Sequence, residues 1–183
     1  IRRGDWSSDV CSSDLEKPNI ITVAWAGTIC SDPAMVSISV RKERYSHDII
    51  KETGEFVINL VNKRLVRATD YCGVKSGRDV DKFAETRLTP QASRYVKAPG
   101  IEESPVNIEC KVTEVKELGS HDMFLAKVVG VTIDNQYMDD KGKFNLNASG
   151  LTAYSHGEYF ELGKKLGSFG YSVRKPAKKK KKR

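Results

Sequence analysis

Alternating apolar and polar positions predict a chain built mainly of strands. Residues 34–42 alternate without a break, so that Val36, Ile38 and Val40 share one face of a strand. Residues 19–30 are almost continuously apolar and β-branched, which is typical of one strand buried on both faces. The chain therefore begins its ordered part with two strands of different character.

The same patterns predict further strands at residues 56–61, 105–116, 123–133 and 166–173. Short helices are expected between them. The first begins with Ser46 as its N-cap and stops at Gly54; a second covers part of 63–77, and a third, capped by Asp79, ends near Thr86. At least six strands with short helices favour a mainly β (α+β) fold, a Greek-key or split β-barrel.

Residues 5–15, DWSSDVCSSDL, do not fit this pattern. They have no apolar period, and the string matches the translation of a short-read sequencing-library adaptor. We therefore expect residues 1–15 to be an artefact that replaces the authentic N-terminus, which leaves 16–173 as one folded domain. The family resemblance given below implies a strand before residue 17, and its loss would leave an unpaired edge in the barrel.

The formal charge of +7 resides in the C-terminal tail. The last ten residues, RKPAKKKKKR, carry eight positive charges and no negative one, and residues 16–173 are neutral overall. We expect 174–183 to be a disordered Lys-rich tail. A nucleic-acid-binding barrel that uses this tail is a disfavoured alternative, because base-stacking barrels need aromatic residues on a basic face.

Hydropathy and the spacing of the cysteines indicate where in the cell the protein is expected. No run approaches the roughly 20 apolar residues of a membrane span, so we expect no membrane association. Cys30, Cys72 and Cys110 lie far apart and form no CxxC pair, so neither a metal site nor a disulfide framework is indicated. Reduced thiols fit a cytoplasmic protein.

A phosphate site is the chemistry that the residues themselves indicate, since GxGxxG, P-loop, HExxH and GxSxG motifs are absent. Ser39 and Arg41 lie on the polar face of a strand that leads directly to a helix start at Ser46. A helix N-terminus and an Arg fork both suit a dianionic phosphate. The alternative is that this polar face is simply solvated.

Three further residues stand out. Lys82 falls in the first turn of a short helix, where a cation opposes the helix dipole. It is therefore either neutralised by its Asp neighbours or placed for an anionic ligand. Trp25, between small residues in AWAG, is either a core side chain or part of a close-approach site for a flat ligand. His121 in the turn GSHD is an exposed turn histidine unless a ligand lies near it.

Five ordered motifs carry a family resemblance: PNIITVAWAG, SDPAMVSISVRKERYS, SGRDVDKF, SPVNIECK and GSHDMF. Together they resemble the flavin reductase-like, FMN-binding split-barrel family, and within it the flavoredoxin branch. The resemblance covers residues 17–135 and extends more loosely to about 173. It implies a homodimer that binds FMN without a covalent bond near the subunit interface.

The resemblance also implies roles for residues. Along the isoalloxazine and ribityl chain it places Asn19, Ala24, Trp25, Ala26 and Gly27. It assigns the phosphate to Ser39, Arg41 and Ser46, with Lys82 adding charge. It brings His121 and Tyr154 near the ring, with the alternative that one of the two comes from the partner subunit. His121 is then the one candidate for a catalytic role, in proton handling, although a plain hydrogen bond to the cofactor is the alternative.

The implied function is an FMN-dependent oxidoreductase that moves electrons from NADH or NADPH through FMN to an acceptor. A non-enzymatic flavoprotein that stores FMN or passes electrons to a redox protein partner needs the same pocket, and the sequence does not separate the two. One departure from the family concerns Arg87, where relatives usually have Gly. That position is expected to close a helix in the left-handed conformation.

Overall fold

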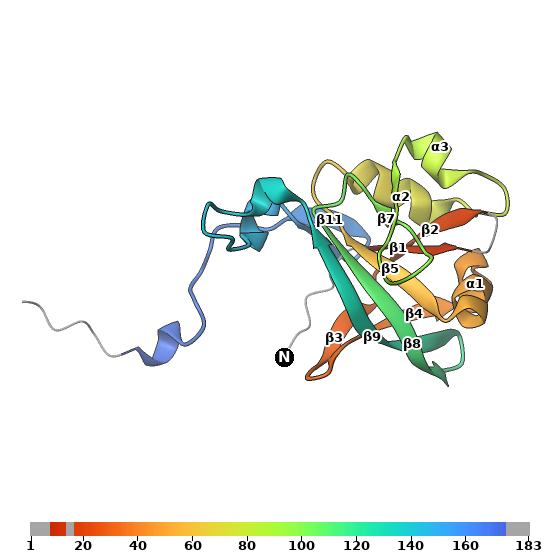
Figure 1. Cartoon of the computed structure of the whole chain (residues 1–183), viewed down its shortest axis with the longest axis horizontal. Helices are drawn as coiled ribbons and strands as arrows, with labels where there is room; N and C mark the ends of the chain where they lie inside the picture. Colours follow the sequence, from red (N-terminus) through yellow and green to blue (C-terminus); the bar gives the residue numbers. More distant parts are fainter. Residues whose placement is uncertain (1–7, 14–16, 175–183) are drawn as a thin grey trace, which may run out of the picture.

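A seven-stranded antiparallel sheet forms the body of the molecule (Figure 1). The computed structural model describes residues 8–13 and 17–174. The strands lie in the order β2 (Pro18–Val23), β1 (Ser8–Ser13), β5 (Glu55–Leu60), β8 (Val106–Glu117), β9 (His121–Ile133), β4 (Ala34–Arg41) and β3 (Ala26–Ser31). The inner face of this sheet carries the main core, which includes Ile38, Phe56, Cys110 and Phe124, all without exposed surface.

The sheet closes on itself because its two end strands are consecutive in the chain. β2 and β3 are separated only by the bend at Ala24–Trp25, so the chain itself brings the two edges together. At that bend the Ser39 amide of β4 donates to the Trp25 carbonyl oxygen at 2.9 Å. The predicted split β-barrel is confirmed, and the split lies beside β2.

The bend corrects one prediction about residues 19–30. They do not form one buried strand: β2 is buried on both faces, whereas β3 is mostly exposed. The apolar pattern continues across the bend, which is why it did not reveal the break. The predicted strand at 34–42 is confirmed as β4, with Val36, Ile38 and Val40 in the core.

The three α-helices of the described chain lie where short helices were expected, but α1 and α3 have other N-caps than predicted. α1 (Tyr45–Thr53) ends at Gly54, whose φ of 68° confirms the expected stop. Its N-cap is Arg44 rather than Ser46, because the Ser46 hydroxyl accepts a hydrogen bond from the Asn19 side chain instead. α2 (Val66–Val74) lies within the expected segment.

α3 (Lys82–Thr86) ends where predicted, but Asp79 does not cap it. The cap is Asp81, whose carboxylate accepts from the Ala84 amide at 3.2 Å. α2 and α3 cover the outer face of β1 and β2, where a second apolar cluster includes Cys11, Ile20, Cys72 and Phe83. This outer cover explains why β2 is buried on both faces.

β1 differs from the expectation that residues 1–15 contribute nothing to the fold. Residues 8–13 pair with β2 on one side and β5 on the other, and Val10 and Cys11 have no exposed surface. The barrel edge expected to be unpaired is therefore occupied. A single apolar pair in a polar segment is a weak periodic signal, and tertiary pairing makes it a central strand. The adaptor origin of this segment stays a hypothesis.

The outward face of β8 is also covered, although its polar residues were expected to face outward. Asn107 and Glu109 are 4% and 2% exposed because residues 90–101 pack over them. That segment includes the two short strands β6 (Pro90–Gln91) and β7 (Gly100–Ile101). The alternation of apolar and polar residues correctly predicted β8, but it could not show that residues 90–101 pack on the polar face of this strand.

The C-terminal part leaves the barrel. η1 (Asn135–Tyr137) and η2 (Leu146–Ser149) precede a separate hairpin of β10 (Thr152–Ser155) and β11 (Glu158–Glu161). The predicted closing strand at 166–173 is wrong: residues 162–174, which we call the arm, contain only η3 (Tyr171–Val173) and extend away from the body (Figure 1). Gly163, Gly167 and Gly170 interrupt any strand there.

No helix in the part of the chain that the structure describes is long and apolar enough to span a membrane. The predicted Lys-rich tail lies outside the described residues from 175 onward.

Candidate functional site

Three adjoining cavities follow β2 and the Ala24–Trp25 bend, at the split of the barrel. We call them together the β2 groove. Their volumes are about 140, 130 and 210 Å³, and the Arg44 side chain lines all three. Its Nη2 donates to the Gly73 carbonyl oxygen at 2.7 Å, which ties the segment before α1 to α2. Arg44 is thus the residue that joins the parts of the groove.

The first cavity is suited to an anion. Its walls come from β2, the first turn of α1 and the segment after α2, and its side chains include Asn19, Ser46, Lys75 and Lys82. Arg44, Lys75 and Lys82 supply three cations, against the single carboxylate of Glu43. The N-terminus of α1 adds its partial positive charge to the same wall.

A glycine makes the wall of this first cavity possible. Asn19 Nδ2 donates to Ser46 Oγ at 2.8 Å, and both side chains are buried. A Cβ on Gly77 would lie 2.1 Å from Asn19 Oδ1 and 2.9 Å from the Tyr45 ring. Gly77 is therefore required for the close approach of the backbone to Asn19.

Lys82 is held in a way that the sequence did not suggest. The side chain is 4% exposed, and its Nζ donates to the carbonyl oxygens of Ile20 and Cys72 at 2.6 and 2.8 Å. Cys72 belongs to the last turn of α2, whose carbonyl end favours a cation. The charge is thus stabilised by backbone acceptors while the residue still lines the first cavity.

The second cavity has a flat aromatic wall. The Trp25 and His121 rings lie 4.4 Å apart between centroids, with 35° between their planes. Trp25 is 58% exposed, so it is not the core side chain that one alternative expected. The Ser120 hydroxyl contacts His121 Nδ1 at 2.9 Å and leaves Nε2 as the other polar atom of the ring. Such a pair can support a planar ligand.

Ser39 and Arg41 line this second cavity and not the first. Arg41 is exposed, and its guanidinium lies 3.4 Å from the Glu43 carboxylate. The structure therefore does not gather Ser39, Arg41 and Ser46 in one cavity; Arg44 lies between the two groups.

The third cavity carries two tyrosines from the C-terminal hairpin. The rings of Tyr154 and Tyr159 have centroids 5.1 Å apart, and the Tyr159 hydroxyl donates to the Asp70 carboxylate at 3.3 Å. Thr22, Ala24 and Arg44 are shared with the second cavity. Tyr154 therefore lines a branch of the groove, and its place near a flavin ring stays a prediction.

The groove brings together nearly all the residues singled out from the sequence: Asn19, Ala24, Trp25, Ser39, Arg41, Ser46, Lys82, His121 and Tyr154. Ala26 and Gly27 do not line it, because they lie in β3 beyond the bend. Sequence reasoning missed Arg44 and Gly77. Arg44 offered a signal, since a cation immediately before a helix start is as unfavourable as Lys82 at one.

A closed sheet with a groove at its split is typical of flavin reductase-like split barrels. The family model described as "Flavin reductase like domain" matches residues 10–163, so the chain belongs to this family. Two relatives agree over most of their length. A Pyrococcus abyssi protein is 31% identical over 157 residues, covering 86% of this chain and 90% of the relative. An Archaeoglobus fulgidus protein is 33% identical over 133 residues, covering 73% and 75%.

Solved structures agree as well. Flavoredoxin of Desulfovibrio vulgaris (Miyazaki F) superimposes with a TM-score of 0.87 over 95% of each chain, at 31% identity. Flavoredoxin from Methanosarcina acetivorans gives a TM-score of 0.84 over 95% of each chain; at 24% identity it supports the fold alone.

Proposed function

We propose that the protein binds FMN in the β2 groove and moves electrons from NADH or NADPH through it to an acceptor. The observation that carries the proposal is the polarity of the groove. One end collects Arg44, Lys75, Lys82 and the N-terminus of α1, and the other presents the Trp25–His121 pair. A phosphate at one end and a flat ring at the other is the chemistry of FMN.

The donor set fits the phosphate at the first cavity. Ser46 and Asn19 hold each other in place at 2.8 Å, and Gly77 keeps the backbone close to them. Arg44 offers a guanidinium fork, whose geometry suits phosphate oxygens. In this arrangement Ser39 and Arg41 lie nearer the middle of the cofactor, along the ribityl chain.

The ring end is the place where His121 acts. The bound flavin supplies the redox chemistry, and the protein supplies position and electrostatics. Ser120 fixes His121 Nδ1 at 2.9 Å, so Nε2 is the atom that would hold or donate a proton at the ring edge. Trp25 excludes water from one side of the ring, and its small neighbour Ala24 lets the backbone approach it.

Phosphate placement is tested by comparing FMN with riboflavin, which lacks the phosphate. Arg44→Gln and Ser46→Ala should weaken FMN binding by about tenfold or more, because charged hydrogen bonds are lost, and leave riboflavin binding nearly unchanged. Arg67→Gln, an exposed Arg on α2 outside the groove, is the matched control. Equal loss for both ligands would place the phosphate elsewhere.

Reduction of the bound flavin without oxygen distinguishes an NAD(P)H-dependent enzyme from an electron carrier. If the protein is an enzyme, the flavin absorbance of the FMN-bound protein should bleach within seconds of adding NADH or NADPH. The second candidate is a flavoredoxin-like carrier without nicotinamide activity, favoured by the 31% identity to a flavoredoxin over 95% of the chain. For a carrier, only dithionite or a reduced protein partner bleaches the flavin. A chain that takes up no FMN contradicts both.

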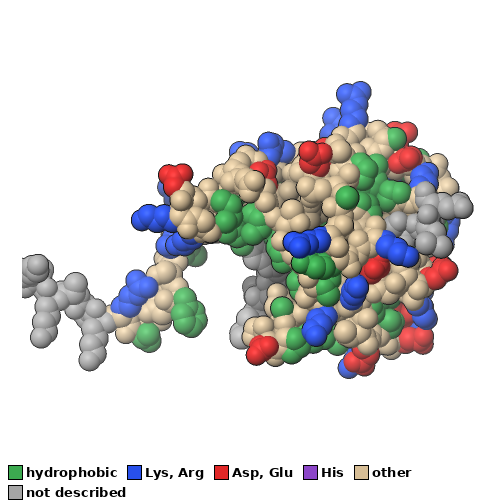
Figure 2. Space-filling view, in the orientation of Figure 1, with side chains coloured by type: hydrophobic (Ala, Val, Ile, Leu, Met, Phe, Trp, Pro, Cys, Tyr) green, Lys and Arg blue, Asp and Glu red, His purple; other side chains and the backbone are tan. Residues whose placement is uncertain are grey.

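We further propose that the protein is a cytoplasmic homodimer. No disulfide joins the four cysteines in the structure, which fits a reducing compartment. The arm exposes Leu162, Leu166, Phe169, Tyr171 and Val173, each by more than half of its surface. Figure 2 shows hydrophobic side chains on the segment that extends from the body, and such a segment gains most by packing on another chain.

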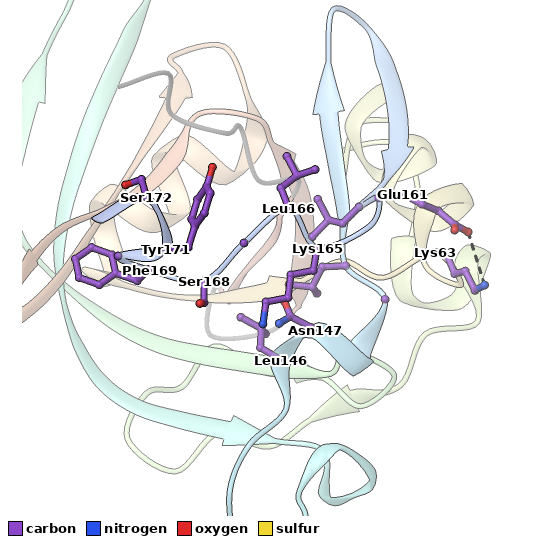
Figure 3. A pocket seen from close by; sticks show the side chains of 16 residues that line it. Lys63, Leu146, Asn147, Glu161, Lys165, Leu166, Ser168, Phe169, Tyr171 and Ser172 are labelled. Atoms are coloured by element: carbon purple, nitrogen blue, oxygen red, sulfur yellow. Dashed lines mark ion pairs between the residues drawn. The ribbon is translucent and has the colours of Figure 1, made fainter. Parts of the chain in front are cut away.

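The arm also borders a cavity of about 920 Å³, which Leu146, Asn147 and Leu151 line as well (Figure 3). A second copy of the chain is the occupant we propose for it. The double variant Leu166→Ser/Phe169→Ser should shift the molar mass in solution, measured by light scattering, from dimer to monomer. Leu118→Ser, at an exposed hairpin turn, is the control, and an unchanged mass would contradict the proposal.

A further inference from the structure

A buried hydrogen-bonded pair, His47 and Asp122, lies next to the β2 groove without lining it. His47 is 4% exposed and Asp122 is 1% exposed. His47 Nε2 lies 2.8 Å from Asp122 Oδ2, and the other ring nitrogen, Nδ1, lies 2.9 Å from Asp48 Oδ1. Both nitrogens are thus engaged by carboxylates, so the ring cannot turn without losing a hydrogen bond.

The surroundings favour the ionised form of Asp122. Burial by itself would raise the pKa of this carboxyl, but the hydrogen bond with His47 and the nearby Lys42 ammonium outweigh burial, so the pKa is lowered. Lys42 Nζ lies 3.4 Å from Oδ1, an ion-pair distance without a directed hydrogen bond. The Phe124 ring packs edge-on against His47, with centroids 5.6 Å apart. The other charged groups around the pair are Asp48, Arg78, Lys51 and Glu117.

Each member of the pair adjoins a residue of the groove. Asp122 follows His121 at the start of β9, and side chains alternate along a strand, so one enters the interior while its neighbour faces the groove. His47 follows Ser46 in the first turn of α1. The register of β4 and β9 sets Val40 opposite Asp122 and Arg41 opposite His121. The His47–Asp122 bond therefore links the α1 start at Ser46, in the first cavity, to the β9 start at His121, in the second.

We propose that His47 is a positioning residue that, through Asp122, holds His121 against Trp25 and fixes the α1 start relative to the ring end of the groove. It lines none of the three cavities and takes no part in the chemistry. Its effect on cofactor binding rests on the proposed function. Its effect on the Trp25–His121 pair does not.

A matched pair of substitutions isolates the Asp122 bond. The amide nitrogen of His47→Gln can reach the position of Nε2 and donate to Asp122, whereas His47→Asn reaches only the position of Nδ1, on the Asp48 side. Both are polar and of similar size, so a general loss of packing affects them alike. His156→Asn, which removes an exposed histidine from a hairpin turn, is the remote control.

The first readout uses the protein without flavin. In a Trp6→Phe background Trp25 is the one tryptophan, and a contacting imidazole quenches its emission. We expect His47→Asn to raise Trp25 emission and to shift the His121 ring signals in NMR, with unchanged far-UV circular dichroism. His47→Gln should behave as the parent does. Unchanged emission and His121 signals in His47→Asn overturn the proposal, even where stability falls.

The second readout is the free energy of unfolding as the pH is lowered below neutral. A carboxyl with a lowered folded pKa contributes stability above its unfolded pKa of about 4, and that stability is lost as the pH falls through the folded pKa. Without the His47 bond, the folded pKa of Asp122 lies closer to its unfolded value, so the free energy of unfolding of His47→Asn should fall less as the pH drops through this range than it does in the parent or in His47→Gln. The same dependence of the free energy of unfolding on pH in His47→Asn and in the parent would contradict the proposal.

The third readout is FMN affinity, where we expect an approximately tenfold loss in His47→Asn and little loss in His47→Gln. If the parent itself binds no FMN, the proposed function fails while the first two readouts still decide the role of His47. Equal FMN affinity in the parent and His47→Asn would show that the positioning does not reach the cofactor, and it would overturn that part.

Discussion

Arg87 closes α3 in the left-handed conformation, with φ of 57° and ψ of 33°. Its side chain is exposed, so glycine would lose no buried contact there. We expect Arg87→Gly to raise the free energy of unfolding by about 1 kcal/mol in urea titrations, because only glycine adopts this conformation without strain. Gly54→Ala, at the matching position after α1, should lower it by a similar amount. A destabilised Arg87→Gly would contradict this account.

Cys110 and Cys30 differ in reactivity for a physical reason. Burial, with a smaller contribution from Glu109, raises the pKa of the Cys110 thiol to about 12. At pH 8 only about one Cys110 in ten thousand is then a thiolate, and none of its surface is exposed. We expect iodoacetamide to label the half-buried Cys30 first and Cys110 only after unfolding, as measured by peptide mass spectrometry. Equal labelling rates in the native protein would rule this out.

Among elements, the segment over β8 is held by buried polar side chains. The Glu109 carboxylate accepts from the Arg94 and Tyr95 amides at 3.1 and 2.6 Å, and Asn59 Oδ1 accepts from the Ile101 amide at 2.9 Å. The Glu55 carboxylate accepts from the Lys97 amide. These contacts explain why strand residues with a polar pattern are buried.

Glu109→Ala should therefore lower the free energy of unfolding by about 3 kcal/mol, because two backbone donors lose their acceptor in a buried place. It should also speed hydrogen exchange at the Tyr95 amide. Lys111→Ala, two residues along the same strand and exposed, is expected to change stability by less than about 0.5 kcal/mol. Similar effects of the two variants would show that the carboxylate does not hold the segment.

At the scale of the whole molecule, the barrel depends on β1. This strand lies between β2 and β5, and Val10 points into the main core without exposed surface. We expect Val10→Asp to prevent cooperative folding. Burying an unpaired charge costs more free energy than the roughly 5–15 kcal/mol by which a folded domain is stable. Circular dichroism and gel filtration check this.

Ile29→Asp, in the mostly exposed strand β3, is the matched control and should still fold. A folded Val10→Asp would mean that residues 8–13 contribute little and that the barrel tolerates the unpaired edge expected from the sequence.

The sequence by itself determined most of the strands, the fold class and most of the groove. Strict alternation fixes which face of β4 is buried, and Gly54 stops α1 because these effects act between near neighbours in the chain. The motifs around Asn19, Trp25, Arg41, Ser46 and His121 indicated the same part of the molecule before any geometry was known, although not which cavity each residue lines.

Only the tertiary structure decided how distant segments meet. The Asn19–Ser46 bond, the Lys82 contacts with Ile20 and Cys72, and the His47–Asp122 pair join residues far apart in the chain, and no local pattern encodes them. β1 became a strand through pairing on both sides, and the arm did not, because it finds no partner strand in the described chain. Pairing and burial are properties of the whole fold, so they override weak local preferences.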